Sequence, residues 1–313
     1  MNLLLLLDPL NTLKPYKDSS VAIMRAAARR QHAVHAAGPG DLLWRDGAVW
    51  ARTHVLRVSD EDAHWYDAAE PKLQPLAGFD AVLMRKDPPF DSEYLYATQL
   101  LSLAQAQGAK VFNAPDALRD FNEKLAILRF PQWIAPTLVS RSMNELKAFA
   151  SQYGDVIFKP LDGMGGMEVF RVREDGLNLN AILETLTRQE SRTIMAQRYL
   201  PQIRDGDKRV LLIDGEVVPW ALARMPAEGE TRANLAAGGR GVAQPLDERE
   251  REIAEGLAPQ LRAAGLLLVG LDMIGGWLTE INVTSPTGLV EIFAQSGCDA
   301  AAMVVDALER RCA

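Results

Sequence analysis

The residues with the clearest chemical potential are three oxygen-bearing side chains near the C-terminus. The stretch GLDMIGGWLTEINV carries Asp272 on one strand-like segment and Glu280 and Asn282 on the next. Carboxylate and amide oxygens suit Mg²⁺ or Mn²⁺ rather than zinc. The alternative is a set of acids on a solvated sheet face, but Leu278 and Ile281 belong to apolar runs typical of buried strands. Because buried charges need partners or metals, the pattern predicts a divalent metal site.

The turn between these segments decides whether the three side chains can meet. Side chains alternate along a strand, so a two-residue turn at Gly275-Gly276 would put Asp272 on the face opposite Glu280 and Asn282. A three-residue loop, with a glycine in the left-handed bulge position, would put all three on one face. The hypothesis of a metal site therefore requires the three-residue loop.

A second hairpin places two arginines together. The stretch DGDKRVLLIDGEVVPWALAR turns at Asp214-Gly215, and a two-residue turn there puts Asp207, Arg209, Trp220 and Arg224 on one face. Guanidinium forks match phosphate and carboxylate oxygens, so the pair suits a phosphorylated intermediate and its transition state. Either arginine alone would be an ordinary surface residue; their shared face is what indicates a site.

A lysine and a glycine-rich loop form the third feature, in FKPLDGMGGMEVF. The loop has neither the G-K-S/T ending of a P-loop nor the G-x-G-x-x-G spacing. It joins two strand-like runs, so it resembles a flap whose backbone N–H groups could cover phosphates, with Lys159 as a point charge. The alternative is an ordinary hairpin with an exposed lysine, since glycines mark most hairpin turns.

A long glycine-rich span, Met225 to Gly241, follows the second hairpin. Structureless stretches of this length in a compact domain are usually lids or disordered segments. Arg232 and Arg240 favour a lid over anions.

The elements that carry these features fall into two halves. Residues 1 to about 120 alternate strand-like and helical patterns, with buried strands at Leu3 to Leu7 and Ala81 to Met84. This predicts an open parallel sheet flanked by helices, with ligands at the C-terminal strand ends, where Arg85, Lys86 and Asp87 lie. From about residue 122 the chain is rich in strand-like runs, which favours antiparallel sheet in an α+β arrangement.

Composition sets bounds on the class of protein. The chain has 313 residues, 48% of them hydrophobic, enough for two or three subdomains. A net charge of -7 opposes nonspecific binding to nucleic acid, and no segment is long enough for a membrane span. The opening MNLLLLLDP is better explained as a buried strand than as a signal peptide. Two cysteines cannot form a disulfide framework, which favours the cytoplasm.

Six motifs together resemble bacterial glutathione synthetase, a member of the ATP-grasp superfamily. They are MRKDPPFD, NEKL, KPLDGMGG, DGDKRVL, ETRANLAAGGRG and LTEINVTSP, and the resemblance runs from about Asp8 to the C-terminal helix. It implies an N-terminal α/β domain over residues 1–121, followed by an ATP-grasp fold of two α+β lobes over residues 122–200 and 201–313. The lid would span residues 225–241.

The resemblance also implies a role for each matching residue. ATP phosphates would contact Lys124 and Lys159 under the loop Asp162, Gly163, Met164, Gly165 and Gly166, while adenine would lie near Gln197, Tyr199 and Leu200 and ribose near Asp207. The reacting phosphoryl and acyl groups would be held by Arg209 and Arg224, and metal by Asp272, Glu280 and Asn282. Peptide contacts would come from Arg85, Asp87 and Ser285, and the lid would use Arg232, Gly238, Gly239 and Arg240.

The implied activity is ATP-dependent ligation of γ-glutamylcysteine and glycine through an acyl phosphate, with two Mg²⁺ or Mn²⁺ ions and a homotetrameric, cytoplasmic enzyme. Phosphorylation is needed because a carboxylate is a poor electrophile at neutral pH. One departure is PTGLVEI, in which Gly288 and Val290 replace the expected thiol and basic residue and leave peptide selectivity open. Two alternatives are another ATP-grasp carboxylate–amine ligase and a nonenzymatic ATP-binding module.

Overall fold

The N-terminal sheet has a parallel centre. The computed structural model describes residues 1–225 and 240–313. Strands β1 (Asn2–Leu6), β2 (Ala33–Ala37), β7 (Ala81–Met84) and β8 (Val111–Phe112) run parallel in the order β2-β1-β7-β8. The expected parallel sheet is therefore present.

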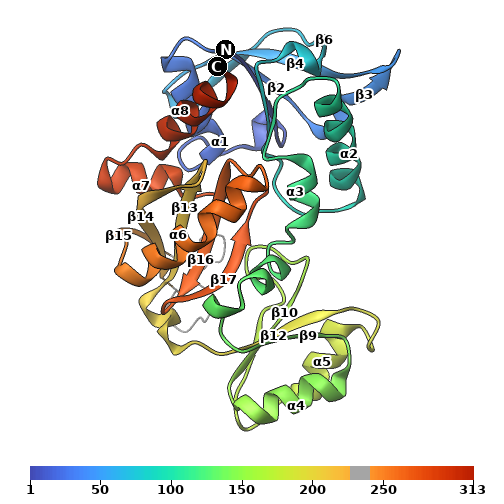
Figure 1. The fold of residues 1–313 in the computed structure, drawn as a ribbon, viewed down its shortest axis with the longest axis vertical. Coiled ribbons are helices and arrows are strands. Elements are labelled where there is room, and N and C mark those ends of the chain that lie inside the picture. The colour runs from blue at the N-terminus through green and yellow to red at the C-terminus, as the bar shows by residue number, and fades with distance from the viewer. Residues whose placement is uncertain (226–239) are drawn as a thin grey trace.

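An antiparallel extension at the β2 edge was not anticipated. It consists of β3 (Leu42–Arg45), β4 (Ala48–Val58), β5 (Tyr66–Ala68) and β6 (Lys72–Pro75), and β4 joins it to β2. The sheet is mixed as a result, with the extension drawn toward the top of Figure 1.

Helices cover both faces of the parallel centre. Leu3 and Leu5 pack in the core that contains helix α1 (Ser19–Arg29), and Leu4 and Leu6 pack in the core that contains α2 (Ser92–Ala106). Burial on both faces explains why the first strand is continuously apolar. Asp18 caps the start of α1, since its side chain accepts hydrogen bonds from the first turn. A short helix, α3 (Pro115–Asp120), then leads out of the domain.

The central lobe is a small antiparallel sheet with helices on one side. Its strands are β9 (Thr137–Ser140), β10 (Val156–Pro160), β11 (Phe170–Val172) and β12 (Ile194–Arg198), in the order β11-β10-β12-β9. Helices α4 (Met143–Tyr153) and α5 (Leu179–Thr187) enclose a separate core around the fully buried Phe158. This lobe lies apart from the rest at the lower end of Figure 1.

The C-terminal lobe is a second antiparallel sheet, in the order β15-β14-β13-β16-β17. Its strands are β13 (Asp207–Ile213), β14 (Glu216–Met225), β15 (Arg240–Pro245), β16 (Leu268–Ile274) and β17 (Trp277–Asn282). Its helices are α6 (Glu248–Ala263), α7 (Leu289–Ser296) and α8 (Ala300–Cys312). The antiparallel arrangement predicted for the second half is thus confirmed.

Asn113 ties the N-terminal domain to the C-terminal lobe. Its Nδ2 donates to the carbonyls of Leu268 and Val283 at 2.8 and 2.7 Å. Its Oδ1 accepts from the N–H groups of Leu267 and Leu268 at 2.7 and 2.9 Å. The two units also share hydrophobic cores, which contain β1 and β7 residues together with β13 and β16 residues. The buried amide is therefore a fixed joint between them.

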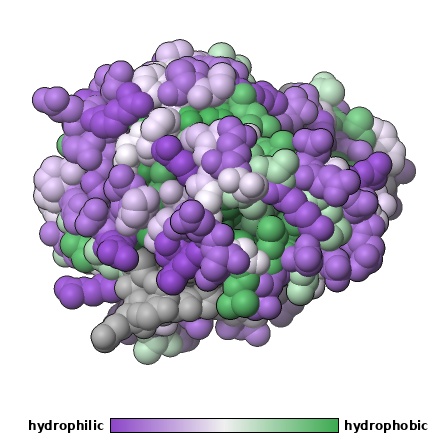
Figure 2. All heavy atoms as spheres, turned by 90° about the horizontal axis from the view of Figure 1, so that it is seen from below, coloured by the Kyte–Doolittle hydropathy of each residue, from purple (hydrophilic) through white to green (hydrophobic). Residues whose placement is uncertain are grey.

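Most of the predicted lid, including Arg232, Gly238 and Gly239, falls outside the described residues. At its ends, Met225 and Arg240 are directly paired as the last residue of β14 and the first of β15. Among the helices of the described ranges, none has the length and apolar character to span a bilayer. Seen from the end of the central lobe, the surface is mainly hydrophilic, with hydrophobic side chains gathered toward its middle (Figure 2).

Candidate active site

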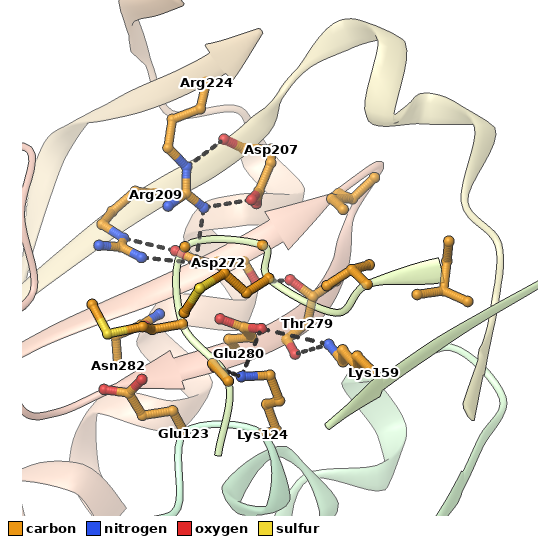
Figure 3. A pocket seen from close by; sticks show the side chains of 18 of the residues that line it. Glu123, Lys124, Lys159, Asp207, Arg209, Arg224, Asp272, Thr279, Glu280 and Asn282 are labelled. Carbon is orange, nitrogen blue, oxygen red and sulfur yellow. Dashed lines mark hydrogen bonds and ion pairs between the residues drawn. The ribbon is translucent and has the colours of Figure 1, made fainter. Parts of the chain in front are cut away.

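A cavity of about 350 Å³ is lined by all three parts of the chain. The N-terminal domain contributes Asp87 and Pro88, the central lobe contributes Lys159 and the glycine loop, and the C-terminal lobe contributes the charged ends of its strands. Figure 3 shows the side chains from β13, β14, β16 and β17 facing the two lysines across this space. The cavity lining includes these predicted site residues: Asp87, Lys124, Lys159, Gly163, Met164, Gly165, Gly166, Gln197, Tyr199, Leu200, Asp207, Arg209, Arg224, Asp272, Glu280, Asn282 and Ser285.

The three proposed metal ligands share one face, but not for the predicted reason. The turn has two residues, because Ile274 pairs with Trp277 across Gly275-Gly276. The register then shifts so that Asp272 lies opposite Glu280 and Gly270 opposite Asn282. The prediction of a three-residue loop is therefore wrong: the extra residue is Thr279, in a β-bulge within β17.

The two arginines share a face, as predicted, and both contact one carboxylate. Arg209 contacts Asp272 side-on, with Nε 2.7 Å from Oδ1 and Nη2 2.8 Å from Oδ2. Arg224 Nη2 lies 2.8 Å from the same Oδ2 and 2.5 Å from Asp207 Oδ2. The register of β13 and β14 shifts beyond Val210, so Asp207 lies opposite Arg224, but a shift of two residues leaves each side chain on its predicted face.

Burial and charge set the two carboxyl groups of this cluster apart. Burial alone would raise the pKa of Asp272, but Arg209 and Arg224 hold it well below the usual range. Burial raises the pKa of Asp207 to about 6 despite Arg224, and the charges of Asp272 and Glu280 add to the rise. Asp272 is thus a permanent anion, whereas Asp207 gains a proton in mildly acidic solution.

The two lysines converge on Glu280. Lys124 Nζ lies 3.7 Å and Lys159 Nζ 3.6 Å from Glu280 Oε1 (Figure 3). Both lysines are buried, and burial together with Lys124 lowers the pKa of Lys159. Lysine, carboxylate and arginine groups therefore surround a space in which phosphate oxygens would find cationic partners.

The glycine loop joins β10 to β11 as the flap interpretation predicted, since the two strands pair antiparallel. Lys124 Nζ donates to the Gly163 carbonyl at 2.5 Å, which holds the loop over the lysine end of the cavity. Asp162 points elsewhere, because it pairs with Arg192 at 2.5 Å, and the same arginine holds Glu168 at 3.0 Å. One arginine therefore fastens both ends of the loop.

The predicted adenine segment forms another wall of the cavity. The Tyr199 N–H donates to the Asp155 carbonyl at 2.9 Å, and Gln197 Nε2 donates to Thr137 at 3.0 Å. Arg171 stacks over the Tyr199 ring at 3.5 Å and pairs with Asp155 through two hydrogen bonds of 2.8 and 2.5 Å. Aromatic and backbone groups held this firmly suit a flat heterocycle.

Two of the three predicted peptide contacts lie together on the cavity wall, and the third lies behind them. Ser285 donates to Asp87 Oδ1, and both residues line the cavity. Arg85 is buried and donates to Ser20 at 3.1 Å and to the Pro286 carbonyl at 3.1 Å. It is not among the cavity-lining residues of the described ranges, so in this structure it braces the wall behind Ser285.

Sequence reasoning missed Glu123, which also lines the cavity. Its carboxylate accepts a hydrogen bond from Thr284 at 2.8 Å, and its carbonyl accepts one from Ile281 at 2.8 Å. Burial raises its pKa, with the charge of Glu280 adding to the rise. The residue stands beside Lys124 in the NEKL motif, which was a signal that could have identified it.

The donor set fits a hard divalent cation bound together with a nucleotide. Asn282 Nδ2 donates to the Gly270 carbonyl at 3.3 Å, which leaves Oδ1 as the acceptor beside Glu280. Asp272 also faces this region but shares its oxygens with the arginines. Within the described ranges, no three acidic, histidine or cysteine side chains are grouped to hold a metal alone. Phosphate oxygens would therefore complete the six-coordinate shell that Mg²⁺ prefers.

Comparison with known proteins gives two family matches that together span most of the chain. The model of the prokaryotic glutathione synthetase N-terminal domain matches residues 1–119, and that of the prokaryotic glutathione synthetase ATP-grasp domain matches residues 123–297. The glutathione synthetase of Neisseria meningitidis serogroup A is 56% identical over 312 residues, with 98% of each chain covered. That of Pseudomonas aeruginosa is 53% identical over 288 residues, covering 92% of this chain and 91% of the relative.

Solved structures give the same fold at lower identity. A D-cycloserine synthetase superposes with a TM-score of 0.71 at 17% identity over the whole of both chains. The ATP-grasp ligase PsnB, complexed with minimal precursor, Mg and ADP, has a TM-score of 0.64 at 16% identity, covering 99% of this chain and 98% of that one. These likenesses establish an ATP-grasp fold.

Proposed function

The chain belongs to the prokaryotic glutathione synthetase family, and we propose that it joins γ-glutamylcysteine to glycine in the cavity between its lobes. It is a ligase, and ATP drives the reaction. The observation that carries the proposal is the convergence of Lys124, Lys159, Arg209 and Arg224 on one cavity with Glu280. Phosphoryl transfer requires such a concentration of positive charge, because catalysis consists mainly of positioning and charge stabilisation.

The nucleotide would lie along the central lobe. Adenine would stack near Tyr199, and the ribose hydroxyls would reach Asp207. The phosphates would pass beneath the glycine loop toward Lys124 and Lys159, whose ammonium groups lie within 4 Å of a shared carboxylate. A γ-phosphate placed here would face Arg209 and Arg224.

The first chemical step is attack by the cysteinyl carboxylate on the γ-phosphorus. A carboxylate oxygen forms the new P–O bond, the bond to the β-phosphate oxygen breaks, and ADP leaves. The guanidinium groups of Arg209 and Arg224 would orient the carboxylate and neutralise the charge that develops on the transferred group. Asp272 holds both guanidinium groups in place, so their orientation exists before the substrate arrives.

In the second step, the unprotonated glycine amine attacks the acyl carbon, and one C–N bond forms as the C–O bond to phosphate breaks. The amine proton leaves with the departing phosphate, as hydrogen phosphate. Water competes for the same carbon, and exclusion of solvent from the cavity favours the amide. We propose that the segment 225–241 acts as a lid, with Arg240 at its described end.

A divalent cation completes the site. Glu280, Asn282 and one oxygen of Asp272 would hold Mg²⁺ or Mn²⁺ with the phosphates, and the cation would offset their charge during transfer. Two ions, a homotetrameric assembly and a cytoplasmic location are further parts of the proposal that rest on the family resemblance. The acidic balance of the chain supports small-molecule rather than nucleic-acid partners.

Phosphate release tests the proposal directly. The purified chain is incubated with ATP, Mg²⁺ and γ-glutamylcysteine, with and without glycine. Released phosphate is measured, and the product masses are determined by mass spectrometry. We expect phosphate release only with both substrates, together with a product of glutathione mass. Equal release with unrelated carboxylic acids would indicate another ATP-grasp ligase, and ATP binding without release would indicate a nonenzymatic module.

A further inference from the structure

Charged residues follow the two central parallel strands at the point where the connections diverge. Asp8 comes after β1, and Lys86 and Asp87 come after β7. Helix α1 follows β1 on one face of the sheet, and α2 follows β7 on the other. In open α/β sheets, the crevice at the carboxyl ends of two such strands is the usual place for a ligand.

Asp8 and Lys86 form an ion pair at these two strand ends. Lys86 Nζ lies 2.8 Å from Asp8 Oδ1 and donates to the Asp87 carbonyl at 2.8 Å. The Asp87 N–H donates to Asp8 Oδ2 at 2.9 Å, so the backbone fixes the carboxylate. The side chains remain 26% and 24% exposed. Both charges are therefore held in place and still reachable by a ligand.

The ion pair adjoins the cavity through Asp87, whose backbone contacts both of its members. Asp87 lines the cavity and accepts a hydrogen bond from Ser285, while Arg85 supports the neighbouring Pro286 carbonyl. A dipeptide with its reactive carboxylate near Arg209 would extend its other end toward this part of the N-terminal domain. That end of γ-glutamylcysteine carries an ammonium and a carboxylate on one carbon.

We propose that Lys86 and Asp8 together recognise this zwitterionic end of the dipeptide, and so select a γ-glutamyl substrate. Lys86 binds the α-carboxylate and Asp8 binds the α-ammonium. An existing ion pair matches a zwitterion because the two opposite charges lie side by side in both partners, and each ligand charge finds its complement without leaving a protein charge unpaired. The inference rests on the proposed function and adds two residues that select the substrate without touching the reacting atoms.

Two analogues of the dipeptide each lack one of the two charges on the α-carbon, so they test the two contacts separately. 4-Aminobutanoyl-cysteine lacks the α-carboxylate, and glutaryl-cysteine lacks the α-ammonium; inhibition constants against γ-glutamylcysteine measure their binding even when neither reacts. Lys86→Met should raise the KM of γ-glutamylcysteine roughly tenfold or more, the usual size of a lost charge-assisted contact, and leave the inhibition constant of 4-aminobutanoyl-cysteine within about twofold. Asp8→Asn should likewise raise the KM of γ-glutamylcysteine and leave the inhibition constant of glutaryl-cysteine nearly unchanged.

Two matched variants serve as controls. Lys72→Met, at an exposed position of β6, should change none of these constants, and Lys86→Arg should keep the preference for the α-carboxylate. A parallel loss for the dipeptide and both analogues in Lys86→Met would overturn the proposal, because it would report general damage rather than charge recognition. If the wild-type chain releases no phosphate with γ-glutamylcysteine and glycine, the proposed function itself fails.

Discussion

Arg209 on β13 and Asp272 on β16 lie directly opposite each other and form a two-pronged ion pair of 2.7 and 2.8 Å. Both side chains are buried. The planar fork of the guanidinium fits the carboxylate, and its remaining nitrogen lies 3.4 Å from the Thr287 hydroxyl. A substrate that reaches Arg209 therefore meets a side chain whose orientation is already fixed.

Arg209→Lys tests this fixed orientation. The ammonium keeps the charge but cannot make the fork, so we expect kcat to fall by about 100-fold, the scale of removing one transition-state donor. The KM for ATP should change by less than about threefold, because the loss acts mainly in the transition state. Steady-state kinetics measure both, with Arg204→Lys at an exposed position as the control. A large rise in KM alone would make Arg209 a ground-state contact.

Glu280→Gln tests the proposed metal site. The change keeps the size of the side chain and removes the charge that faces Lys124 and Lys159. We expect the Mg²⁺ concentration for half-maximal rate to rise by about tenfold or more, with kcat reduced and the melting temperature little changed. Glu216→Gln, on an exposed position of the same lobe, should behave as wild type. An unaltered Mg²⁺ dependence would show that Glu280 holds no metal.

Arg171→Met tests the wall at Tyr199. The variant removes the cation over the ring and both hydrogen bonds to Asp155. We expect the KM for ATP to rise by about fivefold with kcat within about twofold, because the contact fixes a binding surface and not the reacting groups. Arg173→Met, two residues along and exposed, is the matched control. Equal losses in kcat would contradict a role confined to nucleotide binding.

Asp207 should make stability depend on pH in the acidic range. Its pKa is raised from 3.8 to about 6 in the folded chain, so the native state keeps this proton more firmly than the unfolded state. The stabilising contribution is complete below about pH 4 and is lost as the pH rises through about 6. The free energy of unfolding of Asp207→Asn, relative to wild type, should therefore increase by roughly 2 kcal/mol between about pH 4 and pH 6.5. Urea titrations at several pH values measure this difference, and parallel curves would refute it.

Asn113→Ala should destabilise the chain severely. The side chain makes four hydrogen bonds, two given and two accepted, to buried backbone groups of the C-terminal lobe. Each buried group left unpaired costs about 1–3 kcal/mol, so the free energy of unfolding should fall by at least about 3 kcal/mol. Asn144→Ala, on the exposed side of α4, should fall within about 0.5 kcal/mol of wild type. Chemical denaturation compares the two, and a small effect for Asn113→Ala would mean that water replaces the lost bonds.

The residues that share a face of the site could be predicted from the sequence, because a register error of two residues leaves each side chain on the same face of the sheet. Asp207, Arg209 and Arg224 share a face although β13 and β14 pair two residues away from the expected register. Asp272 and Glu280 also share a face, but through the bulge at Thr279 rather than a longer turn. The Thr279 hydroxyl donates to the Asp272 carbonyl at 3.0 Å, a cross-strand contact that supports the bulge and leaves no periodic signal.

Features that depend on distant contacts could not be predicted. Among the described residues, the antiparallel strands β3 to β6 pair with the parallel sheet only through β4. Arg171 acquires its position from Asp155 and Tyr199, and Arg192 from both ends of the glycine loop. None of these partners is close enough in sequence to form a local pattern, and each becomes visible only once the chain is folded.

The contacts of Asn113 between the N-terminal domain and the C-terminal lobe determine where the chain could be cut into fragments that fold. A break after residue 121 would separate the N-terminal domain from a lobe with which it shares two hydrophobic cores. Each half would then expose an apolar surface complementary to the other, so neither fragment should remain dispersed alone, whereas the two expressed in one cell should reassemble. Residues 137–198 contain a core of their own and are the better candidate for an autonomous fragment.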